Sequence, residues 1–229
     1  MNFTKIVSFI KTTLSLIKIF LKIKKSNNKI IFFYFPVKAY YQNIIDISEH
    51  LKKNKKIDLF LIYNNNSQEI LKNNKNSYFL DINYLKFIPF SNFFLKKVNL
   101  FISSYVNYVF LPESKNIYIC HDIADSPMVN ANQEKKLFLS LAKLHYIFLS
   151  SSNVVEYFRN KFLQFGHNVN DIPELINTGY LKLDKVMKEL RRIKNTKNHI
   201  LLAPTFSRQM KSYNMSSKLD VIINNILKK

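Results

Sequence analysis

Short apolar runs alternate with longer amphipathic segments along most of the chain. The apolar runs are continuous rather than alternating, which is typical of strands buried on both faces of a sheet. The first of them, KIIFFYFP, is ended by Pro36. Together the runs predict strands at 29–36, 58–63, 77–81, 99–105, 116–121, 146–150, 174–177 and 200–203.

The amphipathic segments between these runs predict helices. Asn153 with Glu156 three residues later resembles a capping box, so we expect a helix to begin there. Further helices are expected at 40–53, 132–145, 184–193 and 216–228. Strands that alternate with helices of about a dozen residues indicate an α/β domain with a parallel sheet.

The first 25 residues contain another helical pattern, with lysines on one face and apolar residues over the rest. Lys11, Lys18, Lys22 and Lys25 share the polar face. Lysines also interrupt the apolar sequence, so no run approaches the roughly 20 apolar residues of a membrane span. Two interpretations stay open: a basic helix lying on an anionic membrane surface, or a helix packed on its own domain with a solvated lysine face.

The charge balance narrows the classes of partner. The chain has 229 residues with 35 Lys+Arg against 15 Asp+Glu, a formal net charge of +20. Such a charge favours polyanionic neighbours. Most of the positive charge is lysine, and arginine is the better bidentate reader of phosphates and base edges, so we do not expect specific recognition of nucleic acid.

Few residues offer catalytic or metal-binding chemistry. The single cysteine, Cys120, excludes an intrachain disulfide framework, and we predict that it belongs to the core. The five histidines are scattered without the spacing of a zinc site, so no metal is expected. His145 and His199 are expected to be structural. No glycine-rich phosphate loop is present, and no cofactor is predicted.

Parallel sheets bind ligands at the carboxyl ends of their strands, which directs attention to His121. This residue would end the strand NIYICH on the same face as Ile117 and Ile119, close to the carboxylates of Asp122 and Asp125. An imidazole oriented by a carboxylate can act as a general base. The alternative is a hydrogen-bonded histidine at a strand end.

Thr178 and Gly179 follow another predicted strand. Gly179 is one of only two glycines in the chain, so it marks a backbone position that requires a positive φ or a close approach. A helix beginning near Asp184 could place its N-terminus close to a phosphate. An ordinary strand-to-helix turn explains the same residues equally well.

Several segments in order resemble the CDP-glycerol glycerophosphotransferase family of teichoic-acid and capsule polymerases. They are IYICHDIADSPM at 117–128, YIFLSSSNVVEYF at 146–158, INTGYLKLD at 176–184 and ILLAPTFSR at 200–208. The last two are similar to the family patterns T-G-Y-P-R-x-D and I-L-Y-A-P-T-[WF]-R. The resemblance implies a GT-B-like fold with two Rossmann-like domains, of which this chain would contain the N-terminal one.

The resemblance also implies a reaction. His121 would take a proton from an acceptor hydroxyl, which attacks the β-phosphorus of CDP-glycerol and releases CMP. Substrate contacts would come from Asp122, Ser126, Thr178, Gly179, Lys182, Thr205 and Arg208. The implied partners are a nucleotide donor, a lipid-linked or polysaccharide acceptor, and the anionic inner face of the cell membrane, to which the protein would bind peripherally from the cytoplasm.

The match is incomplete in ways that bear on activity. Leu181 and Lys182 replace the family's Pro and Arg, and Ser207 is inserted before Arg208. We expect a membrane-associating helix at 1–26, an acceptor-side domain at 27–195, and only the start of a nucleotide-binding domain at 196–229. The chain would then be a fragment, one product of a split gene, or an inactive remnant, with little turnover by itself.

Other functions remain compatible with the residues. One is a different GT-B glycosyltransferase that uses a nucleotide sugar for capsule or lipopolysaccharide. Another is a polyanion-binding module without catalysis, which only the charge supports.

Overall fold

The computed structural model describes residues 3–36, 38–64, 76–85, 87–88, 91–105, 111, 113–120 and 131–179. The chain divides into two compact units, Met1–Val186 and Met187–Lys229, and every described residue belongs to the first. The strands and helices predicted beyond residue 179 therefore lie outside the described residues.

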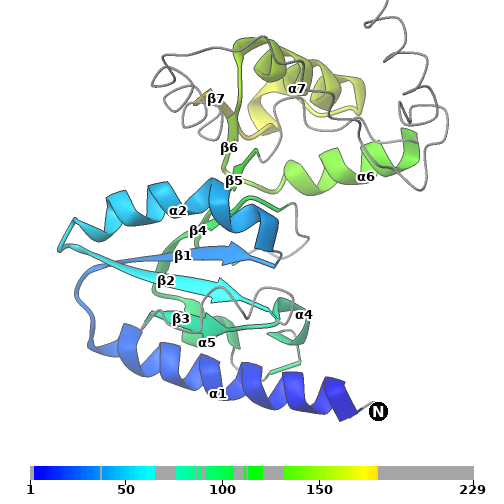
Figure 1. Cartoon of the computed structure of the whole chain (residues 1–229). Coiled ribbons are helices and arrows are strands. Elements are labelled where there is room, and N and C mark those ends of the chain that lie inside the picture. Colours follow the sequence, from blue (N-terminus) through cyan, green and yellow to red (C-terminus); the bar gives the residue numbers. More distant parts are fainter. Residues whose placement is uncertain are drawn as a thin grey trace, which may run out of the picture. The chain divides into compact units, whose positions relative to one another are not determined.

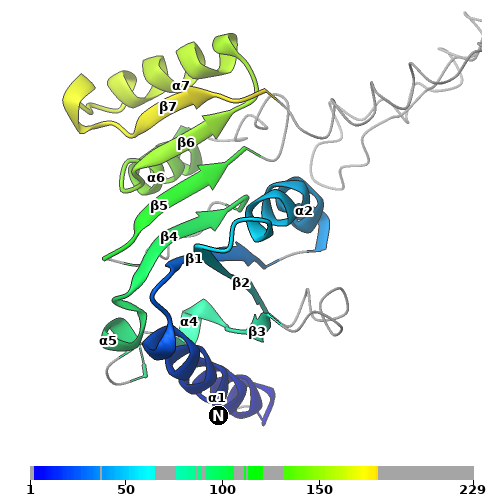
Figure 2. The same cartoon turned by 90° about the vertical axis from the view of Figure 1, so that its left-hand side faces the viewer.

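Seven parallel strands form one sheet in the order β3-β2-β1-β4-β5-β6-β7 (Figures 1 and 2). The predicted α/β class with a Rossmann-like parallel sheet is confirmed. The strands are β1 Lys29–Phe35, β2 Ile57–Tyr63, β3 Ser77–Phe79, β4 Val98–Ser103, β5 Lys115–Ile119, β6 Tyr146–Leu149 and β7 Glu174–Asn177.

Helices cover both faces of the sheet. They are α1 Phe3–Lys25, α2 Lys38–Lys52, α4 Ile82–Leu85, α5 Ser91–Leu95, α6 Ala131–Leu141 and α7 Ser152–Gln164, with a 3₁₀ turn η2 at Val169–Asp171. The short helices α4 and α5 were not predicted, because four or five residues are too few to show a helical period.

Alternate residues of β1 enter two different hydrophobic clusters. Phe32 packs with α1, while Phe33 packs in the cluster that α2 borders, so α1 and α2 lie on opposite faces. A third cluster joins β5 and β6 to α6 and α7. Helices on both faces explain why the strand sequences are continuously apolar.

The N-terminal helix α1 packs on its own domain with one narrow face. Its buried positions are Ser8, Thr12, Leu16, Ile19 and Ile23. Thr12 Oγ1 accepts a hydrogen bond of 3.1 Å from the amide of Asp81, just beyond the carboxyl end of β3. At the other end of the helix, Lys22 Nζ lies 3.4 Å from Asn76 Oδ1, just before β3. The helix therefore runs antiparallel to β3. No helix in the described part of the chain is long and apolar enough to cross a membrane.

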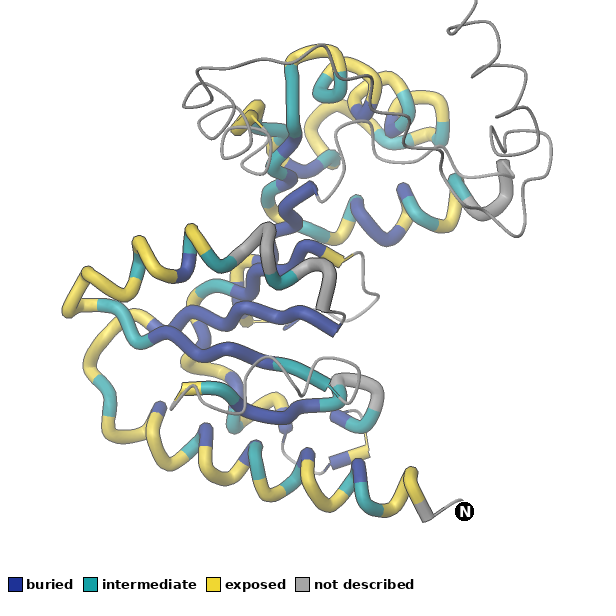
Figure 3. The backbone as a smooth tube through the Cα atoms, in the orientation of Figure 1, coloured by how far each residue is buried: buried dark blue, intermediate teal, exposed yellow. Residues whose placement is uncertain are grey.

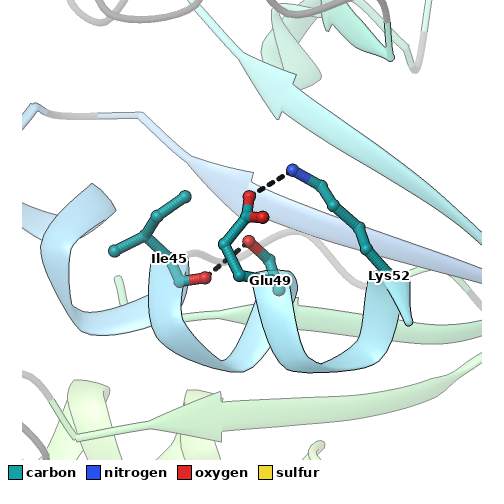
Figure 4. A network of polar contacts seen from close by, with 4 residues as sticks. Ile45, Glu49 and Lys52 are labelled. Carbon is teal, nitrogen blue, oxygen red and sulfur yellow. Dashed lines mark hydrogen bonds and ion pairs between the residues drawn. The ribbon is translucent and has the colours of Figure 1, made fainter. Parts of the chain in front are cut away.

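Two polar contacts on α2 are made within the helix (Figure 4). Ser48 is fully buried, and its hydroxyl donates a 2.8 Å hydrogen bond to the carbonyl of Ile45. Glu49 and Lys52 form an ion pair on the solvent side of the same turn. The Ser48 hydroxyl is therefore hydrogen-bonded although the residue is buried, which avoids the cost of an unpaired polar group in the core.

A buried asparagine fixes the start of β5. Asn116 Nδ2 donates to the carbonyls of Leu111 (3.1 Å) and Ser114 (2.9 Å), and its Oδ1 accepts from the amide of Leu111 (3.1 Å). Its own amide donates to Nδ1 of His145 over 3.1 Å. His145 is thus structural, as predicted, although it lies beyond the end of α6 rather than inside that helix.

The predicted start of α7 was wrong by two residues. Ser151 is the N-cap, with an extended backbone, and its hydroxyl accepts a 3.3 Å hydrogen bond from the amide of Val154. Asn153 is therefore already inside the first turn. Ser150, Ser151 and Ser152 precede Asn153. A serine can therefore cap the helix as soon as the extended chain leaves β6, before Asn153 is reached.

Candidate functional site

The carboxyl ends of the parallel strands lie along one edge of the sheet, where we expected the site. The strand order reverses direction between β1 and β4, the kind of position at which open α/β sheets form a binding crevice. At the end of β4, the Ser103 hydroxyl donates to the carbonyl of Tyr105 (2.9 Å) and accepts from its amide (3.0 Å). This bonding closes a tight turn, so Ser103 shapes the edge.

Two tyrosines lie at the same edge and were not singled out from the sequence. Tyr63 ends β2 and pairs in register with Phe35, and the ring of Tyr41 from α2 lies 5.2 Å from the Phe35 ring. Burial raises the pKa of Tyr63. Burial, and then the charge of Glu49, raise the pKa of Tyr41. Both phenols therefore stay protonated at neutral pH and can serve only as neutral hydrogen-bonding groups.

The ends of β6 and β7 are joined by main-chain and side-chain hydrogen bonds. The amide of Thr178 donates to the carbonyl of Leu149 over 2.9 Å, and the Thr178 hydroxyl lies 3.3 Å from the same oxygen. Asn177 Nδ2 donates to Ser152 Oγ over 3.0 Å. Asn177 Oδ1 accepts from the amide of Gly179 at 3.3 Å. The predicted substrate-binding pair of Thr178 and Gly179 is thus placed beside the first turn of α7.

Gly179 adopts a positive φ of 76°. Of the two reasons proposed for this glycine, backbone conformation is the one observed, because no atom of the described residues, its chain neighbours apart, comes within 4 Å of the position that a Cβ would occupy. Space beside Gly179 is therefore open within the described part of the chain.

The end of β5 leads directly to the predicted catalytic histidine. The amide of Cys120 donates to the carbonyl of Phe148 over 2.9 Å, which continues the β5–β6 pairing by one residue. Ile117 and Ile119 enter the cluster that α2 borders, whereas Tyr118 and Cys120 enter the cluster of α6 and α7. Cys120 is buried in the core, as predicted.

Most of the predicted site residues lie outside the described residues. They are His121, Asp122, Ser126, Lys182, Thr205 and Arg208. Their predicted roles stay predictions. The structure does show that β5, β6 and β7 are neighbouring strands. The segment 121–128 continues from the end of β5, and the segment 180–184 continues from the end of β7.

Comparison with known proteins adds no family to this picture. No protein-family model and no curated protein matches the chain. The functional assignment therefore depends on the residues and on the geometry of the sheet edge.

The described residues hold no group of three or more His, Cys, Asp or Glu side chains that would bind a metal ion. The carboxylate of Glu134 on α6 is engaged instead by α7: Lys161 Nζ lies 3.0 Å from Oε2, and the Tyr157 hydroxyl donates to Oε1 over 2.8 Å. Burial opposes ionisation of Glu134, but these two hydrogen bonds and the lysine charge outweigh burial, and they lower its pKa. Glu134 therefore has a structural role.

A separate hollow lies at the opposite, amino-terminal edge of the sheet. Its volume is about 390 Å³, and it is lined by the last turns of α1 and α2 and the start of β2. Its described lining includes three lysines, Lys22, Lys25 and Lys52, and one carboxylate, that of Asp58. The Asp58 carboxylate accepts a 3.0 Å hydrogen bond from Asn28 Nδ2. The hollow is therefore positively charged and distinct from the strand-end site.

Proposed function

We propose that this chain is the acceptor-side domain of a CDP-glycerol glycerophosphotransferase-like enzyme of cell-envelope polymer synthesis. One observation carries the proposal. The segments at 117–128, 146–158 and 176–184, on which the family resemblance rests, begin on β5, β6 and β7, and these three parallel strands are neighbours. The carboxyl ends of these strands lie at one edge of the sheet, which supports a substrate site shared by the three segments.

The proposed chemistry is a displacement at phosphorus. His121 takes the proton of an acceptor hydroxyl, the freed oxygen forms a bond to the β-phosphorus of CDP-glycerol, and the bond from that phosphorus to CMP breaks. The negative charge on the transferred phosphate would be balanced by Lys182 and Arg208, the cationic residues of the resembling segments. Asp122, Ser126 and Thr205 would supply hydrogen bonds to the substrates.

Thr178 and Gly179 would contact the substrates at the end of β7, Thr178 through its hydroxyl and Gly179 through its backbone. Their positions are fixed by hydrogen bonds to Leu149 and Asn177, and the space beside Gly179 is open as far as the structure describes the chain. A rigid strand end of this kind is suited to orient a substrate, because little conformational freedom is lost on binding.

The proposed location is the cytoplasmic face of the cell membrane, with a lipid-linked or polysaccharide acceptor. Support comes from the net charge of +20 and from the six lysines of α1, a helix without any acidic residue. Donor, acceptor and membrane are all anionic, so one basic protein surface would attract each of them.

The test is release of CMP from CDP-glycerol. The assay includes membranes of the producing cells as the source of acceptor and of any partner chain. We expect the protein to accelerate CMP release, and His121→Ala to reduce this acceleration by about 100-fold or more. His50→Ala, at an exposed histidine in the last turn of α2, is the matched control and should leave the rate unchanged.

Parallel reactions with other CDP-alditols and with UDP-sugars separate the alternatives. Release of UMP from a UDP-sugar, with no CMP from CDP-glycerol, would replace the proposal with a nucleotide-sugar glycosyltransferase. A folded protein that releases no nucleotide from any donor in the presence of these membranes would refute an enzymatic role.

A further inference from the structure

Helix α1 has a second apolar face in addition to the one that packs on the sheet. Counting 100° per residue, the five buried positions occupy an arc of about 80°. A second arc of about 80° is centred roughly 160° away from the first. It contains five large aliphatic residues, all exposed to solvent: Ile6, Ile10, Leu14, Ile17 and Leu21.

These exposed residues form one continuous stripe. Spacings of four, four, three and four residues place them along a line about 22 Å long on the helix surface. Leu14 is 56% and Leu21 53% exposed. In Figure 3 the exposed positions of α1 lie on the side away from the sheet, and the buried ones face it. Among the described residues the domain does not use this patch for packing, and an exposed apolar patch of this kind marks an interaction site.

Aromatic residues widen the apolar surface beside the stripe. The ring of Phe20 lies 4.8 Å from the ring of Phe94 and 6.2 Å from that of Phe93, both on α5. Phe93 is 65% exposed. The interaction surface thus includes one side of α5.

Lysines border the stripe on its other side. Lys11 and Lys22 lie over the rings of Phe79 and Tyr78, with Nζ 5.9 Å and 5.1 Å from the ring centroids. Lys18 and Lys25 are also exposed. On the helical wheel they lie between the aliphatic stripe on one side and Lys11 and Lys22 on the other. At the C-terminal end of α1, the basic hollow contributes one further lysine, Lys52 of α2, to this basic surface. Apolar and basic groups are therefore combined on one surface.

We propose that this outward surface of α1 binds an anionic lipid bilayer, with the helix axis parallel to the membrane. The aliphatic stripe would enter the boundary between headgroups and acyl chains, while Lys18, Lys25 and the basic hollow would contact lipid phosphates. A second copy of the chain fits less well, because pairing two such helices would bring lysines together with no acidic residue of α1 to balance them. The inference deepens the proposed function by stating how the enzyme would reach a lipid-linked acceptor.

The chain contains no tryptophan, so a single tryptophan can report insertion. The probe is Leu14→Trp, and the matched control is Leu139→Trp, at an exposed leucine of α6. With phosphatidylglycerol-containing vesicles, we expect the emission of Leu14→Trp to shift to the blue and that of Leu139→Trp to stay unchanged. Vesicles of phosphatidylcholine alone should bind weakly, and added salt should weaken binding to the anionic vesicles.

Flotation of the protein with the same vesicles tests the stripe directly. We expect Leu14→Glu and Leu21→Glu to weaken binding by about tenfold or more, because each places a charge in the apolar interface. Leu139→Glu and Leu163→Glu, at exposed leucines of α6 and α7, should change binding by less than about twofold. Circular dichroism establishes that each variant is folded.

Equal vesicle binding by stripe and control variants would overturn the inference. So would a wild-type protein that ignores vesicles but forms dimers that Leu14→Glu dissociates, a result that would assign the stripe to a second copy. Neither measurement involves CDP-glycerol, so a failure here leaves the transferase proposal standing, and loss of CMP release with normal vesicle binding leaves this inference standing.

Discussion

The main-chain amide of Thr178 donates a hydrogen bond to the carbonyl of Leu149, and the Thr178 hydroxyl lies within 3.3 Å of the same oxygen. The last residues of β6 and β7 are therefore held together one residue beyond the final strand pair, Leu149 with Asn177. A site built on these strand ends is held by the sheet itself.

Replacement of Thr178 separates this structural role from substrate binding. Thr178→Val removes the hydroxyl and keeps the shape, and because the residue is exposed we expect the free energy of unfolding to fall by less than about 1 kcal/mol. Because the hydroxyl is proposed to contact substrate, CMP release should fall by about tenfold, the effect of one lost hydrogen bond. Thr13→Val, which removes a 3.0 Å bond to the carbonyl of Phe9 in α1, is the control, and its activity should match wild type.

The two glycines should respond alike in stability and differently in activity. Gly166 and Gly179 have φ of 87° and 76°, and apart from its chain neighbours no described residue comes within 4 Å of the Cβ position of either glycine. Alanine at either position should cost about 1–2 kcal/mol through backbone strain alone. Urea denaturation measures this cost. Only Gly179→Ala should also reduce CMP release; equal activity of the two variants would remove Gly179 from the site.

The Glu134 carboxylate should make stability depend on acid pH. Its folded-state pKa is lowered below the usual 4.5, so its ionised form stabilises the fold above that value. The contribution disappears as the pH falls through the lower, folded-state pKa. We expect Glu134→Gln to lose about 1 kcal/mol at pH 7 and to show a smaller further loss between pH 5 and pH 3 than wild type. Glu156→Gln, at an exposed position of α7, should reproduce the wild-type profile.

Two neighbouring leucines of α1 should differ sharply when replaced by alanine. Leu16 is 1% exposed in the core, whereas Leu14 points to solvent. We expect Leu16→Ala to lower the free energy of unfolding by about 2–5 kcal/mol and Leu14→Ala to change it by less than about 0.5 kcal/mol. Comparable losses at both positions would contradict the packing of α1 on the sheet.

Asn116 should be the most sensitive polar residue of the described core. Asn116→Ala removes three side-chain hydrogen bonds at a residue that is 2% exposed, so we expect a loss of about 2–3 kcal/mol. Asn99→Ala, which removes a single 2.8 Å bond to the amide of Ile30, should cost about 1 kcal/mol. Thermal unfolding of the two variants gives the comparison.

The strands were predictable because burial on both faces produces continuous apolar runs such as that of β1. The rule that ligands bind at the carboxyl ends of strands directed attention to Thr178 and Gly179, and these residues do lie directly after β7. Tyr41 was missed because it reaches the edge from a helix, through packing on Phe35 that no local pattern encodes.

The sequence also could not predict which face of α1 packs on the sheet. With aliphatic residues on two sides of the helix, composition alone favours neither, and the observed choice places Ser8 and Thr12 inward instead of Ile10 and Leu14. The hydrogen bond from the Asp81 amide to Thr12 connects residues 69 positions apart, a long-range contact that helical periodicity does not contain.

Because α1 runs antiparallel to β3, its first turns lie near the carboxyl end of β3, and a bilayer along this helix would run along the direction of that strand. Thr178 follows β7, which stands at the other end of the seven-stranded sheet. Six strand spacings of about 4.8 Å separate β3 from β7, a distance of roughly 29 Å. A lipid-linked acceptor would therefore have to rise well above the headgroups, on a long polar chain, to reach the end of β7.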